Sequence, residues 1–194
     1  MAQRYESVDL VDRTVVERLA GAVVIAALTA ALALVSVPYP FSPAPISFQG
    51  IGVYLAALLL GPLWGGFSFV LYLSVGLLGL PVFSNGAAGL GYFTGPTGGF
   101  LVGFLVAAVV IGAIVHRNVE PRPLSEIPIA LQAGALFVGL AIIYVIGAPW
   151  LAMQTGMSLQ EGFVAGAIVF IPGDVVKIAA TLALIKGGEL ADLT

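Results

Sequence analysis

The chain has 194 residues, of which 60% are hydrophobic and only 9% are charged. A soluble domain carries about 25% charged residues, so a fold of this size could not hide so much apolar surface from water, and its solvent must be lipid. The absence of cysteine excludes disulfides, thiolate metal sites and cysteine nucleophiles. The net charge of −3 and the lack of a basic patch give no reason to expect a nucleic-acid partner.

Two long uncharged runs predict an integral membrane protein in the cytoplasmic membrane. No Asp, Glu, Lys or Arg occurs from Leu19 to His116 or from Ile127 to Gln160. A spanning helix needs about 20 mainly apolar residues, which leaves room for five or six spans. The first run lacks a clear cleavage site, so we interpret it as a span and not as a signal peptide. We expect an N-terminal tail at 1–18, an all-α membrane domain at 19–187 and a C-terminal tail at 188–194.

Six helices are expected in chain order, with boundaries at proline and glycine. Their ranges are Leu19–Val37, Ile46–Leu60, Leu63–Leu80, Gly98–Val115, Ile127–Ile146 and a sixth helix within Leu159–Lys186. Four prolines at 38, 40, 43 and 45 predict a loop after the first helix. Gly61 and Pro62 predict a tight turn, Pro149 a connector, and Pro172 with Gly173 an interruption of the sixth helix.

The basic residues predict the orientation, because cytoplasmic loops carry the excess of Lys and Arg. With six spans, the two termini, the turn between helices 2 and 3 and the loop between helices 4 and 5 share one side. That side holds Arg4, Arg13, Arg18, Arg117, Arg122 and Lys186, and the loops of the other side hold no basic residue. Both termini are therefore predicted to be cytoplasmic. An odd number of spans would put the 4–5 loop and Lys186 on opposite sides.

Asp174 and Lys177 are the only two charges well inside the hydrophobic part of the chain. An intramembrane charge costs about 2.5–3.5 kcal/mol, and such residues usually mark a substrate or ion path. Three residues apart on a helix, the two side chains lie on one face. One interpretation is an ion pair that neutralises itself. We favour a ligand site, because a paired cation and anion offer a donor and an acceptor at the same depth.

The segment Pro81–Gly99 is rich in glycine and is expected to form an extracellular loop between helices 3 and 4. Glycine lets a backbone approach a ligand closely, Asn85 offers both an amide carbonyl and an NH₂ group, and Tyr92 and Phe93 offer flat apolar surfaces. The alternative is a plain connecting loop with an Asn-Gly turn. The segment is too glycine-rich for a stable helix, and no Lys follows the glycines as in a phosphate-binding loop.

Small residues recur every four positions in the first helix, at Ala22, Ala26 and Ala30. This spacing allows another helix to approach closely, either within the protein or in a partner membrane subunit. His116 is the only histidine, and at the end of helix 4 it is interpreted as an interfacial cap. No catalytic cluster and no metal-binding cluster is visible, so an enzyme has little support.

Five segments in order resemble the BioY family, the biotin-specific substrate-binding components of energy-coupling factor (ECF) transporters. They are Pro-Ile-Ser-Phe-Gln (45–49), Leu-Leu-Leu-Gly-Pro (58–62), Gly-Leu-Pro-Val-Phe (79–83), Gly-Pro-Thr-Gly-Gly-Phe (95–100) and Phe-Ile-Pro-Gly-Asp-Val-Val-Lys (170–177). Each motif alone is modest, but together they cover about residues 15–187. The resemblance implies a six-helix bundle that binds biotin from outside and hydrolyses no ATP itself. It implies no cofactor, and as partners a transmembrane coupling subunit, docked on the alanines of helix 1, and two ATPase subunits.

The resemblance also assigns biotin contacts to Asn85, Asp174 and Lys177, with Gln49 and Tyr92 as weaker candidates for the wall. The chemistry of biotin fits, because its ureido ring carries two N–H donors and one carbonyl acceptor. Two other functions stay open at this point: the same architecture for thiamine or riboflavin, and a purely structural membrane protein.

Overall fold

The computed structural model describes residues 12–188, and helix α1 (Arg13–Leu34) begins almost at the start of this range. The side chain of Asp12 caps the helix by accepting from the Thr14 amide at 2.8 Å, and Arg13 pairs with Glu17 at 2.8 Å. The helix therefore starts six residues before the predicted Leu19. The predicted tail overlaps this helix at 13–18, and its residues 1–11, like residues 189–194 of the C-terminal tail, lie outside the described range.

A two-stranded hairpin follows α1 and replaces the end of the predicted first helix. Strand β1 (Ser36–Val37) pairs antiparallel with β2 (Ile46–Ser47), Ser36 opposite Ser47. The predicted proline loop connects the two strands. The second helix accordingly begins at Gln49 and not at Ile46, because Ile46 is used in the hairpin.

Helix α2 (Gln49–Leu77) contains the predicted turn as a break at Gly61, whose φ of 72° and ψ of −172° are not helical. A Cβ at Gly65 would lie 2.7 Å from the Ala56 carbonyl oxygen, so the two arms of α2 are in close contact beside the break. Pro62 has no N–H for the Leu58 carbonyl, and the buried His116 donates to this oxygen at 3.0 Å instead. His116 was expected to act as an interfacial cap. In the structure its side chain links the end of α4 to α2.

The glycine-rich segment is more ordered than predicted. It contains a 3-10 turn, η1 (Ser84–Gly86), and a short helix, α3 (Gly89–Phe93), so the expectation of no helix was wrong for these five residues. Aromatic packing holds the segment down. The Phe83 ring stacks on Tyr92 with centroids 5.4 Å apart, and it fills the space that a side chain at Gly76 would need.

Helix α4 (Gly98–His116) matches its predicted range within one residue, whereas α5 (Ile129–Thr155) does not end at Pro149. A short 3-10 turn, η2 (Leu124–Glu126), lies between them. The predicted connector was wrong because Pro149 removes one helical hydrogen bond, and packing around the fully buried Ala148 and Leu151 carries the helix through it. The helix ends at Gly156, whose φ is 72°.

The last predicted helix consists of three pieces: α6 (Leu159–Gly166), the 3-10 turn η3 (Ile168–Phe170) and α7 (Ile171–Lys186). The break lies at Ala167, with φ of −136° and ψ of −64°, and not at Pro172 and Gly173. Pro172 falls in the first turn of α7, where its missing N–H has no helical partner to lose.

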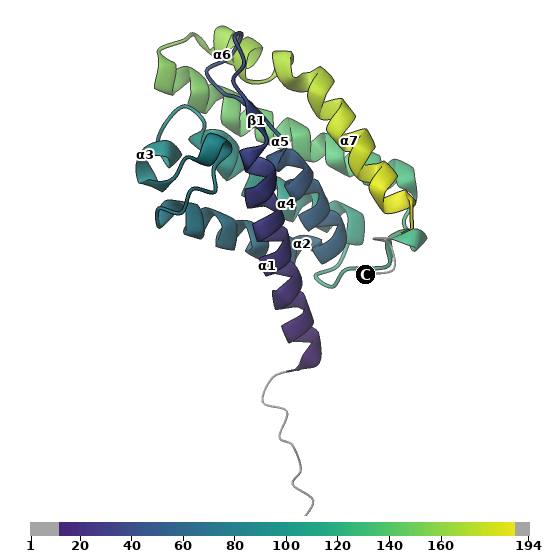
Figure 1. Ribbon diagram of the computed structural model, residues 1–194. Coiled ribbons are helices and arrows are strands. Elements are labelled where there is room, and N and C mark those ends of the chain that lie inside the picture. Colours follow the sequence, from purple (N-terminus) through teal and green to yellow (C-terminus); the bar gives the residue numbers. More distant parts are fainter. Residues whose placement is uncertain (1–11, 189–194) are drawn as a thin grey trace, which may run out of the picture.

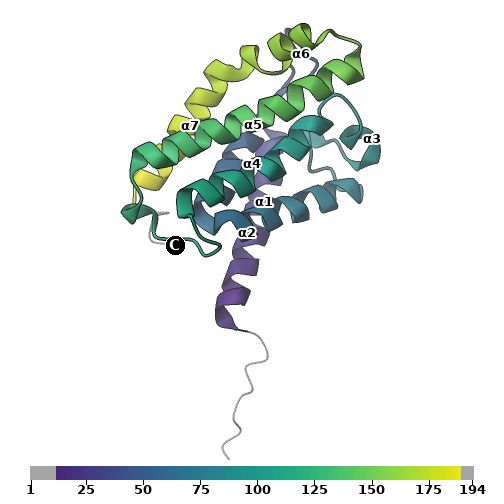
Figure 2. The same cartoon turned by 180° about the vertical axis from the view of Figure 1, so that it is seen from behind.

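Helices α2, α4 and α5 pack in that order, α1 lies against α2, and α7 contacts both α2 and α5 (Figures 1 and 2). The N-terminal part of α1 projects beyond the other helices. Within residues 12–188, five helical stretches are long and apolar enough to cross a membrane: α1, α2, α4, α5 and Leu159–Lys186. Large apolar side chains such as Val24, Val145 and Met153 are exposed on the outer surfaces, as expected for helices that face lipid. A mostly helical fold with spans long enough for a membrane is confirmed, with five candidate spans where six were predicted, because α2 continues through the break at Gly61.

Candidate functional site

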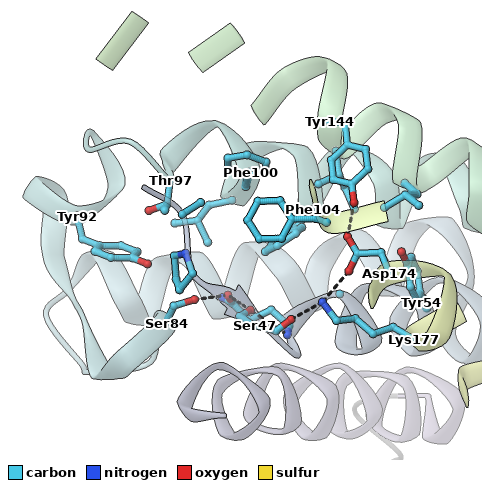
Figure 3. A pocket seen from close by; sticks show the side chains of 18 residues that line it. Ser47, Tyr54, Ser84, Tyr92, Thr97, Phe100, Phe104, Tyr144, Asp174 and Lys177 are labelled. Atoms are coloured by element: carbon cyan, nitrogen blue, oxygen red, sulfur yellow. Dashed lines mark hydrogen bonds and ion pairs between the residues drawn. The ribbon is translucent and has the colours of Figure 1, made fainter. Parts of the chain in front are cut away.

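A cavity of about 640 Å³, including its open part, lies between α2, α4, α5 and α7 and under the two loops that precede α2 and α4 (Figure 3). Its lining residues come from four helices, β2, η1, α3, η3 and the adjoining loops: Ala44, Pro45, Ser47, Gln49, Gly50, Tyr54, Ser84, Tyr92, Thr97, Phe100, Leu101, Phe104, Leu140, Ile143, Tyr144, Phe170, Asp174 and Lys177. The cavity is therefore lined by side chains from segments far apart in the sequence.

The predicted ion pair forms one end of this cavity. Lys177 Nζ donates to Asp174 Oδ1 at 2.6 Å, and the side chains are only 11% and 14% exposed. Two further groups orient the pair: Tyr144 donates to the other oxygen of Asp174, and Lys177 donates to the Ser47 carbonyl at 2.6 Å. The Lys177 ammonium also lies 5.8 Å from the centre of the Phe48 ring.

A second polar network begins at Gln49, where α2 starts. Its carbonyl oxygen accepts from the hydroxyls of Ser47 at 2.7 Å and Ser84 at 2.6 Å, while its NH₂ group donates to Tyr72. Tyr72 in turn donates to the Val82 carbonyl at 2.9 Å. Because the Ser47 carbonyl also accepts a hydrogen bond from Lys177, this network connects the ion pair to the start of the glycine-rich segment.

The middle of the cavity is apolar. The rings of Phe100 and Phe104 lie between the ion-pair end and the end that carries Tyr92 and Thr97 (Figure 3). Trp150 fixes the far end, because its Nε1 donates to the Gly95 carbonyl at 2.9 Å. The cavity can thus hold a ligand with polar groups on an apolar body.

The structure brings together four of the five residues predicted to bind a ligand: Asp174, Lys177, Gln49 and Tyr92 all line the cavity. Asn85 does not. It is exposed in the η1 turn, with φ of 60°, and the neighbouring Ser84 points into the site instead. Asn85 was predicted from its amide chemistry and from the resemblance, and its exposed position agrees with the alternative, an Asn-Gly turn in a connecting loop.

The alanines of α1 that were predicted to dock a partner face the inside of this chain to different degrees. Ala22 is fully buried, and Ala26 and Ala30 pack partly against the core. Close packing with α2 is visible two turns after Ala22, where a side chain at Gly52 would overlap Thr29. Ala22 therefore packs within the protein, as in the alternative interpretation. The exposed face of α1 carries Ala27 and other small residues.

Sequence reasoning missed Ser47, Tyr54, Ser84 and Tyr144, which line the cavity. A tyrosine within an apolar run is ambiguous, since it serves equally well in a core or at a membrane interface. The available signal was weak: a tyrosine hydroxyl inside a span needs a hydrogen-bond partner, and Asp174 is one of the few charged acceptors within the hydrophobic part of the chain. Among the described residues there is no group of three or more His, Asp or Glu that could hold a metal.

Because the helices that enclose the cavity are long and apolar enough to cross a membrane, the chain has the architecture of an integral membrane protein with an internal cavity. More particularly, it belongs to the BioY family, whose model matches residues 3–191. It is 41% identical over 167 residues to the biotin transporter BioY of Rhodobacter capsulatus, covering 80% of this chain and 84% of that protein. It is 36% identical over 161 residues to the biotin transporter BioY of Rhizobium etli, covering 81% and 86%.

A solved structure has the same fold. The crystal structure of the S-component for biotin from an ECF-type ABC transporter superposes with a TM-score of 0.78 at 28% identity, covering 91% of this chain and 92% of that one. The family resemblance inferred from the five motifs is therefore confirmed.

Proposed function

We propose that this chain captures biotin for uptake across the cytoplasmic membrane, as the substrate-binding subunit of an ECF-type transporter. Its relatives from Rhodobacter capsulatus and Rhizobium etli are named as biotin transporters, and the solved structure with the same fold is an S-component for biotin. These names support the choice of ligand. The observation that carries the proposal is the Asp174–Lys177 pair at one end of an otherwise largely apolar cavity.

The pair keeps bonding capacity that a ureido ring can use. Lys177 has three N–H donors, of which the Asp174 carboxylate and the Ser47 carbonyl take two. Asp174 keeps lone pairs beyond those used by Lys177 and Tyr144. One N–H of biotin would donate to Asp174 while its carbonyl accepts from Lys177, and the rings of Phe100 and Phe104 would cover the thioether ring and the chain.

We also propose that the two arms of α2 cross the membrane separately, which gives six spans with both termini in the cytoplasm. Three features gather at one end of the bundle: Arg18 near the start of α1 pairs with Glu120 at 2.8 Å, and Gly61 lies against the backbone of Val119 and Pro121. The start of α1, the break in α2 and the loop after α4 thus share an end, and this end carries basic residues. The glycine-rich segment lies at the opposite, extracellular end.

The partners would be a transmembrane coupling subunit and two ATPase subunits, which would hydrolyse the ATP. On α1, we place the contact with the coupling subunit on the exposed small residues Ala20, Ala27 and Ala31, beside the half-buried Ala26 and Ala30. Ala22 is excluded from that contact because it is fully buried in this chain.

Calorimetry on the detergent-purified full chain tests the substrate, with biotin, thiamine and riboflavin titrated separately. A one-to-one biotin signal that the other two vitamins do not give would support the proposal. No biotin binding, in folded protein free of copurified ligand, would overturn it and leave only the membrane fold and the family.

A further inference from the structure

Tyr54 is the most deeply buried tyrosine of the site, with only 1% of its surface exposed, and it lines the cavity from the first arm of α2. Buried tyrosine hydroxyls usually have a hydrogen-bond partner. The other two buried tyrosines follow this rule, since Tyr72 donates to the Val82 carbonyl and Tyr144 to Asp174. Within residues 12–188 no protein group is hydrogen-bonded to the Tyr54 hydroxyl, which leaves it available to the cavity.

The position of Tyr54 places this hydroxyl at the ion-pair end. Its side chain lies beside Asp174 and Lys177, which line the same end of the cavity (Figure 3). Gly50, one turn earlier on the same face of α2, has no heavy atom within 4 Å of where a Cβ would stand. The helix surface in front of Tyr54 is therefore open space on the cavity side.

We propose that Tyr54 is a ligand-contacting residue that determines specificity, with its hydroxyl donating to the same carbonyl oxygen of the bound ring that Lys177 reaches. A carbonyl oxygen has two lone pairs and accepts two donors. Lys177 supplies one donor, and Tyr54 supplies the second at no cost to the free protein, because it has no bond within the described chain to break. This inference rests on the proposed function, since it takes the ligand to be a cyclic urea.

The consequence is selectivity for a good acceptor at that ring position. A bound carbonyl oxygen accepts from the free N–H of Lys177 and from the Tyr54 hydroxyl, whereas a ligand without that oxygen leaves both donors unpaired in a buried site. Leaving buried polar groups of a site unpaired is what rejects an analogue most strongly.

The experiment compares Tyr54→Phe with the wild type in calorimetric titrations of biotin and of the thione analogue, in which sulfur, a poor acceptor, replaces the ring carbonyl oxygen. We expect Tyr54→Phe to weaken biotin about tenfold, the value of one hydrogen bond, and to change binding of the thione by less than twofold. Tyr92→Phe is the matched control, because it removes a cavity hydroxyl at the other end. It should leave the ratio of biotin to thione affinity unchanged.

Thermal unfolding of the ligand-free proteins separates this role from a structural one. Tyr54→Phe removes no bond within the described chain, so its unfolding midpoint should equal or exceed that of the wild type. Equal biotin affinity in Tyr54→Phe and wild type would overturn the inference while leaving biotin as the substrate, as would equal losses for both ligands. Failure of the wild type to bind biotin would instead overturn the proposed function beneath it.

Discussion

Replacing Asp174 by Asn keeps the shape of the side chain and removes its charge, which tests the centre of the site. The carboxylate is 14% exposed and holds Lys177 at 2.6 Å and the Tyr144 hydroxyl. So little exposure means that water screens the contact weakly, unlike a surface ion pair, which contributes about 0–1 kcal/mol. Removing one partner of a buried, charge-assisted contact costs about 2–5 kcal/mol, and biotin should bind about 30- to several-thousand-fold more weakly.

Calorimetry with biotin gives the affinity, and size-exclusion chromatography in detergent confirms that the variant is folded. Glu126→Gln is the control, because it also removes one negative charge but lies outside the cavity and is exposed. Asp174→Asn protein that binds biotin as tightly as the wild type would refute the assignment of the ion pair to the ligand site.

A double variant decides between the two interpretations of the pair. If Asp174 and Lys177 only neutralise each other, Asp174→Leu combined with Lys177→Met should retain biotin binding, because matched apolar replacements of a buried pair are often neutral for stability. If they bind the ligand, the double variant should stay folded and lose binding. Folded protein with wild-type affinity is the result that contradicts a ligand role.

Three further changes test other parts of the molecule. His116→Ala should lower the free energy of unfolding by about 1–3 kcal/mol, because the Leu58 carbonyl loses a partner that Pro62 cannot replace; thermal unfolding in detergent measures it, and an unchanged midpoint would contradict the role of His116. Gly99→Ala places a Cβ 2.3 Å from Trp150 and should destabilise by about 1–3 kcal/mol, which the same measurement checks. Ala27→Trp, on the exposed face of α1, should keep biotin affinity and reduce copurification with the coupling subunit; intact assembly would remove this face from the proposed contact.

Much of the fold could be predicted because glycine and proline mark the chain where regular hydrogen bonding fails. The break at Gly61 and the start of α4 at Gly98 agree with that reasoning. It failed where tertiary packing overrides the local preference: α5 continues through Pro149, and the last helix breaks at Ala167, a residue with no sequence signal for a break. The start of α1 at Arg13 shows that a helix can continue through a charged stretch next to an apolar run.

Residue type predicted part of the cavity lining where a group is costly to bury. Burying the charges of Asp174 and Lys177 inside the bundle is costly, which is why both were singled out. In the structure they pair at one end of the cavity. The same reasoning could not find Tyr54, because burying a tyrosine costs little. Tyr54 stands out only in the structure, where its hydroxyl has no hydrogen-bond partner among the described residues. For Asn85 the amide chemistry was suitable, but the sequence does not tell which way a turn points its side chain.

The hydrogen bond from Trp150 to the Gly95 carbonyl gives the protein a built-in optical reporter. The chain has two tryptophans, and the other, Trp64, lies in the second arm of α2. After Trp64→Phe, all indole emission would come from one ring that α5 carries and the glycine-rich segment touches. Any displacement of that segment when the cavity fills would change the polarity around the indole N–H. The kinetics of ligand entry could then be followed by stopped-flow fluorescence without attaching a dye.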